Sequence, residues 1–271
     1  MIASIVLAIA LGGATFDDAM IDRQGDIARA VASREAIRND PANPLGYFGL
    51  ALSLYQMGRN EESLAVYDKM IELNVDDATP QYVPSDRGII LMRLGRNEEA
   101  RRDFENALAV LPSFGHAHFN LAVLLVRTGG DPQQVLDHLD LADADDPDKQ
   151  AASHRAYRGA ALFRLGRLEE ARVELEESIR DMPENFAPFN YPSNDVEALF
   201  EGRYYLAQVL KALGRSTEGM QQLENIFTLR AKRLSMPIQV RSSNRPTGYW
   251  PCYEDPDRFV SLLHLWGLPT P

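Results

Sequence analysis

The sequence predicts an all-α protein, a right-handed α-solenoid of about five helix-turn-helix repeats with a capping helix at each end. Three features predict this. A glycine recurs about every 36 residues, a leucine stands four residues before it, and Gly or Ala stands seven before it. Recurrence at this period with amphipathic segments on both sides of the glycine is typical of stacked helical hairpins. These closing glycines are Gly58, Gly95, Gly129/Gly130, Gly166 and Gly214.

The predicted elements follow in order. A helix over 17–39, within a capping region 15–43, ends at Asp40-Pro41. A solenoid over 44–234 then follows, and a linker with a second capping helix occupies 235–271. The five hairpins are expected at 44–73, 80–110, 114–144, 149–181 and 194–232.

Small and large residues alternate between the two helices of each hairpin. The small residues are Ala51, Gly88, Ala122, Gly159 and Ala207, and the large ones, nine after the glycine, are Tyr67, Phe104, Leu139, Leu175 and Leu223. Two helices approach closely where one offers a small residue and the other fills the gap. We therefore expect each pair to form the core of its hairpin.

The segment from Gly88 to Ala100, followed by Phe104, Ala107 and Pro112, resembles the tetratricopeptide repeat, as found in bacterial proteins. The resemblance covers Pro44 to Leu229. It departs at one inserted glycine in the third unit and at Gly219, where the family has Ala. It implies a helical solenoid, and most members of the family are non-catalytic protein-binding scaffolds.

Composition restricts the partners. The net charge is −11 and the pI is about 5.0, which disfavours nucleic acid and anionic membrane surfaces. The lone Cys252 cannot form an internal disulfide or, by itself, a metal site. We expect no cofactor and no integral membrane span.

Residues 1–14 are uncharged and end in small residues, as in the apolar core of a signal peptide. They are too short for a membrane span, which needs about 20 apolar residues. The sequence predicts a periplasmic or secreted protein. The alternative is a cytoplasmic protein with a buried N-terminal helix, since no basic residue precedes the apolar stretch.

Two further segments, which interrupt or follow the repeats, carry several aromatic residues. The insertion 183–192 has three prolines and three aromatics, and is expected either to staple its neighbouring repeats or to act as a recognition loop or groove plug. In the tail, Asp255 and Pro256 predict a helix start, and an apolar stripe follows at Phe259, Leu262, Leu263 and Trp266. We expect this helix to cover the fifth hairpin; the alternative is a docking peptide.

Catalytic motifs are absent from the sequence. There is no G-x-S-x-G, no H-E-x-x-H and no phosphate-binding glycine loop. His116 and His118 form an H-x-H pair, but at this spacing on a helix the two rings point apart. His138 and His154 have no cysteine or distinctive acid at ligand spacing. A metal-assisted hydrolase built on His116 or His118 is the enzyme alternative.

A row of cations and aromatics is the candidate binding site. In the family the first helix of each unit lines an inner groove, so cations two residues before the closing glycines would form a row there, with aromatics beside them. The alternative is that these cations only complement helix dipoles. The candidate residues are Phe48, Tyr55, Arg93, Phe119, Arg127, Tyr157, Phe163, Arg164, Tyr204 and Lys211.

The sequence therefore predicts a non-catalytic scaffold or adaptor that holds a segment of a partner protein in its concave groove. The basic row favours an acidic partner segment. A structural subunit of an envelope or secretion assembly is the second alternative.

Overall fold

The computed structural model describes residues 16–74, 80–145, 152–181 and 193–234, and within them the chain forms helices and no strand. The all-α solenoid predicted from the sequence is confirmed. The helices are α2 (Phe16–Asn39), α3 (Pro44–Gln56), α4 (Asn60–Leu73), α5 (Tyr82–Arg93), α6 (Asn97–Val110), α7 (Gly115–Thr128), α8 (Pro132–Asp145), α9 (Ala152–Arg164), α10 (Leu168–Asp181), α11 (Ser193–Ala212) and α12 (Ser216–Leu234).

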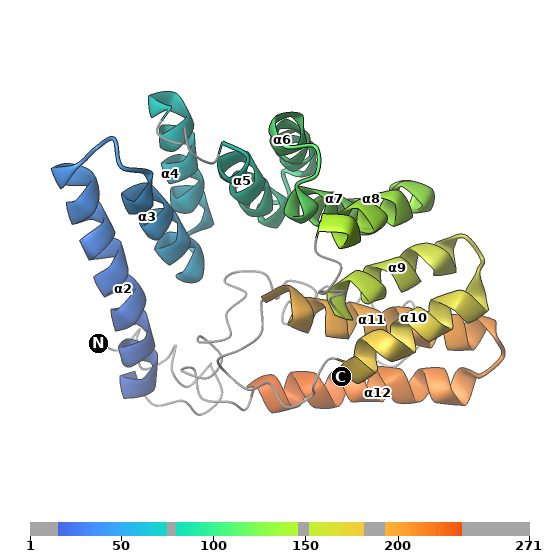
Figure 1. Ribbon diagram of the computed structural model, residues 1–271. Coiled ribbons are helices and arrows are strands. Elements are labelled where there is room, and N and C mark those ends of the chain that lie inside the picture. Colours follow the sequence, from blue (N-terminus) through green and yellow to red (C-terminus); the bar gives the residue numbers. More distant parts are fainter. Residues whose placement is uncertain (1–15, 75–79, 146–151, 182–192, 235–271) are drawn as a thin grey trace.

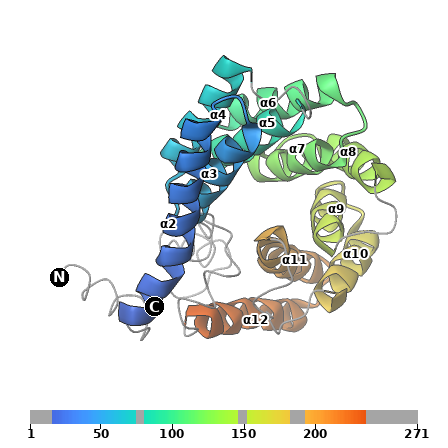
Figure 2. The ribbon, with the colours of Figure 1, turned by 60° about the vertical axis from the view of Figure 1, so that its left-hand side comes forward.

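Five hairpins, from α3–α4 to α11–α12, follow one another along a curved array (Figures 1 and 2). Helices α5, α7, α9 and α11 contact one another in sequence, so the first helices of the hairpins share one face. Figure 2 shows α9 and α11 on the inner side of the curve, with α10 and α12 outside them. We call this inner surface the first-helix face.

Each hairpin turns at its closing glycine in the same way. Gly58, Gly95, Gly166 and Gly214 have φ between +72° and +76°, a backbone conformation that L side chains rarely adopt. The N–H of the next residue donates to the carbonyl of the leucine four residues before the glycine, as from Arg59 to Leu54 at 2.9 Å. This is the Schellman arrangement. The leucine thus serves both the core and the turn.

The helices of a hairpin approach most closely at the predicted small residues. A Cβ on Gly88 would lie 2.5 Å from the ring of Phe104, and a Cβ on Gly159 would lie 2.5 Å from Leu175. Phe104 and Leu175 are fully buried. In the fifth hairpin the same role falls to Gly219, where a Cβ would lie 2.9 Å from the carbonyl oxygen of Ala207. The departure from Ala at that position therefore has a steric reason.

The N-terminal helix α2 packs against α3, and α3 lies between α2 and α4 (Figure 1). No helix in the described part of the chain is long and apolar enough to cross a membrane. Three expectations fall outside the described residues: the signal peptide at 1–14, the insertion at 183–192 and the linker and helix at 235–271.

Substituting Gly88 with Ala tests the helix contact. The added methyl group meets the Phe104 ring, and we expect the free energy of unfolding to fall by about 1–3 kcal/mol despite the better helix propensity of Ala. Urea denaturation measures this. Gly25→Ala is the matched control, because no atom lies within 4 Å of its added Cβ; we expect it to stabilise by about 0.5–1 kcal/mol. Equal effects at the two sites would contradict this account.

Candidate functional site on the first-helix face

All ten candidate residues lie on first helices. Their burial differs: Phe119 and Tyr157 are buried, Arg164 and Lys211 are exposed, and the others are partly buried. Helix α3 carries Phe48 and Tyr55, α5 Arg93, α7 Phe119 and Arg127, α9 Tyr157, Phe163 and Arg164, and α11 Tyr204 and Lys211.

Two of the arginines reach back to the preceding hairpin. The guanidinium carbon of Arg93 lies 3.7 Å from the centroid of the Tyr55 ring, a cation–π contact. A terminal nitrogen of Arg164 donates to the carbonyl oxygen of Gly129 at 3.0 Å. That carbonyl belongs to the turn of the third hairpin. These side chains therefore hold neighbouring repeats together as well as lining the face.

Arg127 reaches forward across two hairpins. It donates to the hydroxyl of Tyr157 at 3.3 Å and pairs with the carboxylate of Glu201 at 3.1 Å. The side chains of Arg127 and Glu201 are only 16% and 12% exposed. The other carboxylate oxygen of Glu201 is buried and accepts no hydrogen bond from any residue that the structure describes. Arg127 is thus the cation that compensates this buried carboxylate.

Aromatic rings fill the same face between the arginines. Phe119 stacks on His154 at 4.5 Å between centroids and meets Tyr157 edge-on at 5.7 Å. Further along, Tyr205 lies 6.4 Å from Phe163 and 5.3 Å from Tyr204. Burial raises the pKa of Tyr205, and the charge of Glu201 raises it further. Tyr205 therefore stays a neutral phenol and hydrogen-bond donor.

Glu201 and Tyr205 were missed by the sequence reasoning. Glu201 is 74 residues from Arg127, and no local spacing links them. The repeat register could have indicated this pair, since Arg127 and Glu201 both stand on first helices of a stacked array. Arg127 and Arg164 differ in their charge pairing. Arg127 is paired with Glu201, whereas Arg164 has no carboxylate partner among the described residues.

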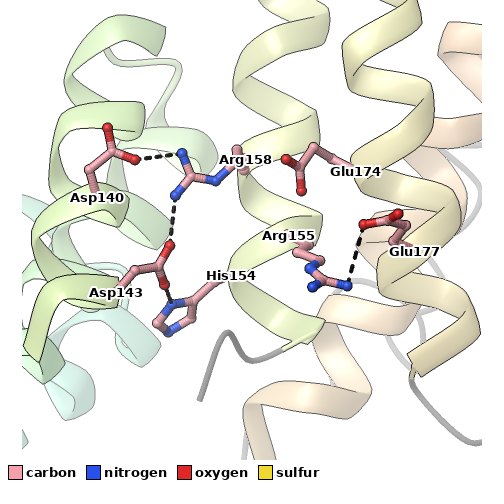
Figure 3. A pocket seen from close by; sticks show the side chains of 7 residues that line it. All are labelled: Asp140, Asp143, His154, Arg155, Arg158, Glu174 and Glu177. Atoms are coloured by element: carbon pink, nitrogen blue, oxygen red, sulfur yellow. Dashed lines mark hydrogen bonds and ion pairs between the residues drawn. The ribbon is translucent and has the colours of Figure 1, made fainter. Parts of the chain in front are cut away.

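A separate polar pocket of about 380 Å³ lies over α9, between α8 and α10 (Figure 3). Arg158 donates to Asp140 at 2.6 Å and to Asp143 at 2.7 Å, which ties α9 to α8. His154 lies 2.5 Å from Asp143 through Nδ1. Arg155 pairs with Glu177 of α10 at 3.5 Å. The pocket is therefore lined by contacts that join three helices.

Two carboxyl groups in this pocket have pKa values shifted in opposite directions, one by its hydrogen-bond partners and the other by burial. Burial would raise the pKa of Asp143, but hydrogen bonds from His154 and Arg158 outweigh it and hold the pKa below its usual range. Burial raises the pKa of Glu174, which neither Arg158 nor Arg155 fully offsets. Glu174 has no hydrogen bond or ion pair among the described residues. Glu174 is therefore the lining group best placed to accept a hydrogen bond from a bound molecule.

The two histidines of the H-x-H pair have separate surroundings. His116 is exposed and lies beside the Phe114 ring, whereas His118 is buried. His118 Nε2 lies 2.9 Å from the carbonyl oxygen of Pro112, and Nδ1 lies 3.0 Å from Nδ1 of His138. Because a carbonyl only accepts, Nε2 of His118 carries the proton. The two Nδ1 atoms form a hydrogen bond in which one ring donates to the other.

The prediction that the rings of His116 and His118 point apart is confirmed, and the partner of His118, His138 on α8, was not foreseen. Within the ranges that the structure describes, no group of three or more His, Cys, Asp or Glu residues could hold a metal ion. Both ring nitrogens of His118 are engaged in contacts. Nothing in this geometry supports the hydrolase alternative.

Arg127→Ala tests the ion pair that spans two hairpins. It leaves the buried Glu201 carboxylate uncompensated, and we expect the free energy of unfolding to fall by about 3–5 kcal/mol. Arg164→Ala removes an exposed arginine and its hydrogen bond to the Gly129 carbonyl, and is expected to cost only about 0.5–1 kcal/mol. Similar costs in chemical denaturation would contradict the structural role of Arg127.

His138 predicts a pH dependence of stability. Burial lowers its pKa, and the neighbouring His118 lowers it further. At mildly acidic pH the unfolded chain therefore binds more protons than the folded one, so the free energy of unfolding falls as the pH drops through the ordinary histidine pKa of 6.5. Urea midpoints at pH 7.5 and 5.5 measure the change. We expect His138→Gln to reduce it, and His116→Gln, at an exposed site, to retain it.

Comparison with known proteins identifies the repeat. Two family models described as tetratricopeptide repeat match the chain, one at residues 17–82 and 85–149 and the other at 152–177. The chain is 38% identical over 76 residues to the TPR repeat-containing thioredoxin TTL4 of Arabidopsis thaliana, covering 28% of this chain and 11% of that protein. It is 29% identical over 85 residues to tetratricopeptide repeat protein 6 of Homo sapiens, covering 31% and 16%. The matched stretch thus spans less than a fifth of either relative.

Solved structures show the same fold. A tetratricopeptide repeat protein from Parabacteroides merdae superposes with a TM-score of 0.58 at 18% identity, covering 90% of this chain and 93% of that one. YrrB, titled a TPR protein with an unusual peptide-binding site, gives 0.52 at 20% identity over 76% and 96%. MamA from Desulfovibrio magneticus gives 0.52 at 16% identity over 69% and 94%. The family models together match more than half of the residues, and the chain belongs to the tetratricopeptide repeat family.

Proposed function

We propose that this protein is a non-catalytic scaffold that holds a segment of a partner protein on the first-helix face. Protein interaction is the general role of the family to which the chain belongs. The observation that carries the proposal is the set of contacts among arginines and aromatic rings on that face, between α3 and α5 and from α7 to α11. Arginine and aromatic residues supply most of the binding energy at protein interfaces.

The contacts between repeats make this face suitable for binding. Arg93 on Tyr55, Arg127 on Tyr157 and Arg164 on the Gly129 carbonyl hold the side chains in defined positions. A surface that is already ordered loses less conformational entropy when a partner binds. The fold likeness to YrrB, a TPR protein with an unusual peptide-binding site, supports binding of a peptide segment.

The exposed cations favour an acidic segment. Arg127 is neutralised by Glu201, so it contributes little to the recognition of charge. Arg164 and Lys211 are exposed on neighbouring first helices, α9 and α11, at the C-terminal half of the face. In a protein of charge −11, these two side chains are where a carboxylate-bearing segment would make charge-assisted hydrogen bonds. We also propose, from residues 1–14, that the protein acts outside the cytoplasm.

Charge reversal at the two exposed cations tests the binding site. Partners are captured by crosslinking from the source organism, identified, and titrated against the wild type and the Arg164→Glu/Lys211→Glu variant. We expect the variant to bind about tenfold more weakly or worse, and the wild-type affinity to fall with added salt.

The matched control reverses two exposed cations on second helices, Arg102 on α6 and Arg180 on α10, with the same net change in charge. We expect Arg102→Glu/Arg180→Glu to retain binding. If both double variants bind equally well, the partner does not use the first-helix face. Circular dichroism confirms that each variant keeps its helices.

A further inference from the structure

A second surface lies outside the first-helix face, at the start of the solenoid. A groove of about 670 Å³ runs between α2 and α4, over α3. We call it the N-terminal groove. Tyr47 and Leu50 of α3, Ile37 of α2 and Val66 of α4 form its apolar lining. Val31 of α2 also lines it and is 53% exposed. An open groove lined by apolar side chains, with a few polar groups at its edge, is typical of a binding site.

The same place in later repeats is lined by ion pairs. Leu50 stands eight residues before its closing glycine, where the second and fourth hairpins have Arg87 and Arg158. Arg87 binds Asp68 and Asp103, and Arg158 binds Asp140 and Asp143. The chain therefore lines this space with paired charged side chains at two repeats and with apolar side chains at the first.

Cations border the groove on both sides. Arg34 and Arg38 lie one helical turn apart on α2 and have no hydrogen bond or ion pair with any described residue. Lys69 borders the other side, on α4, where it pairs with Glu72. An occupant that fits this groove has an apolar stripe with acidic residues next to it.

We propose that the N-terminal groove binds the C-terminal segment of the same chain, residues 254–267. This segment has the required chemistry: the apolar stripe Phe259, Leu262, Leu263 and Trp266, preceded by three acids. The acids Glu254, Asp255 and Asp257 complement Arg34 and Arg38. A helix with this stripe fits an apolar groove in the way that amphipathic helices bind their receptors.

The course of the chain favours an intramolecular contact. In both views α12 ends pointing toward α2, the helix that borders the groove (Figures 1 and 2). Between Leu234 and Asp255 lie 20 residues, which span up to about 66 Å when extended. The effective concentration of a tethered segment then favours binding within the molecule. This inference does not depend on the proposed function of the first-helix face.

Tryptophan fluorescence can test the proposal in the full chain, because both tryptophans, Trp250 and Trp266, stand in the tail. Trp250→Phe leaves Trp266 as the sole reporter. We expect its emission at the short wavelength of a buried indole and weak quenching by acrylamide. Adding Val31→Asp places a charge in the groove and should shift the emission to longer wavelength. Val173→Asp, at an exposed valine of α10, is the matched control and should leave it unchanged.

A contact-range probe identifies the location directly. In a Cys252→Ser background, a bimane label on Lys69→Cys should be quenched by Trp266, whereas the same label on Arg102→Cys of α6 should not. Arg34→Glu/Arg38→Glu should relieve the quenching, and so should added salt.

Each outcome decides the question. Quenching at position 69 that is independent of protein concentration and lost with Val31→Asp supports the proposal. An exposed Trp266 in the parent chain overturns it. If Trp266 is buried but its emission does not change with Val31→Asp, the proposal is also overturned. The tail then binds elsewhere, such as on the fifth hairpin. Burial that grows with protein concentration assigns the groove to a second copy and overturns the intramolecular contact.

Discussion

The close approach of two helices at a residue with a small side chain, or with none, determines the geometry of each hairpin. Where Gly88 faces Phe104 and Gly159 faces Leu175, the ring or the isobutyl group occupies the space that a Cβ would need. This contact fixes the distance between the first and second helix, and therefore which side chains of the first helix turn inward. The first-helix face and the grooves between second helices both follow from it.

Arginine side chains make three kinds of contact in this protein. The position of the arginine within the repeat determines which kind it makes. Next to the closing glycines, Arg59 and Arg96 pair with glutamates three residues on, at exposed sites where such pairs contribute little. On the outside, Arg87 bridges the acids of two successive second helices. On the first-helix face, Arg127 compensates a buried carboxylate. On the first-helix face Arg93 and Arg127 also contact aromatic rings, and for this reason we propose that face as the binding site.

The sequence predicts the helices well because each hairpin repeats its own local signals. The glycine turn, the leucine four residues earlier and the small residue seven earlier all act within one repeat. Contacts between repeats were not predictable in the same way. His118 with His138, His154 with Asp143, and Arg127 with Glu201 depend on the angle at which helices stack. The candidate cations lie on first helices, but the pairing of Arg127 with Glu201 could not be foreseen from spacing.

The link between Arg127 and Glu201 has a consequence for how the molecule folds. In a simple solenoid each repeat touches only its neighbours, so stability is a sum over adjacent interfaces and the ends can fray one repeat at a time. Here an ion pair joins the third hairpin directly to the fifth, and Tyr157 of the fourth hairpin shares the same guanidinium. The three hairpins then lose this contact together when any one of them opens. Amide exchange across α7 to α11 would accordingly follow one cooperative opening, while the N-terminal hairpins exchange as separate units.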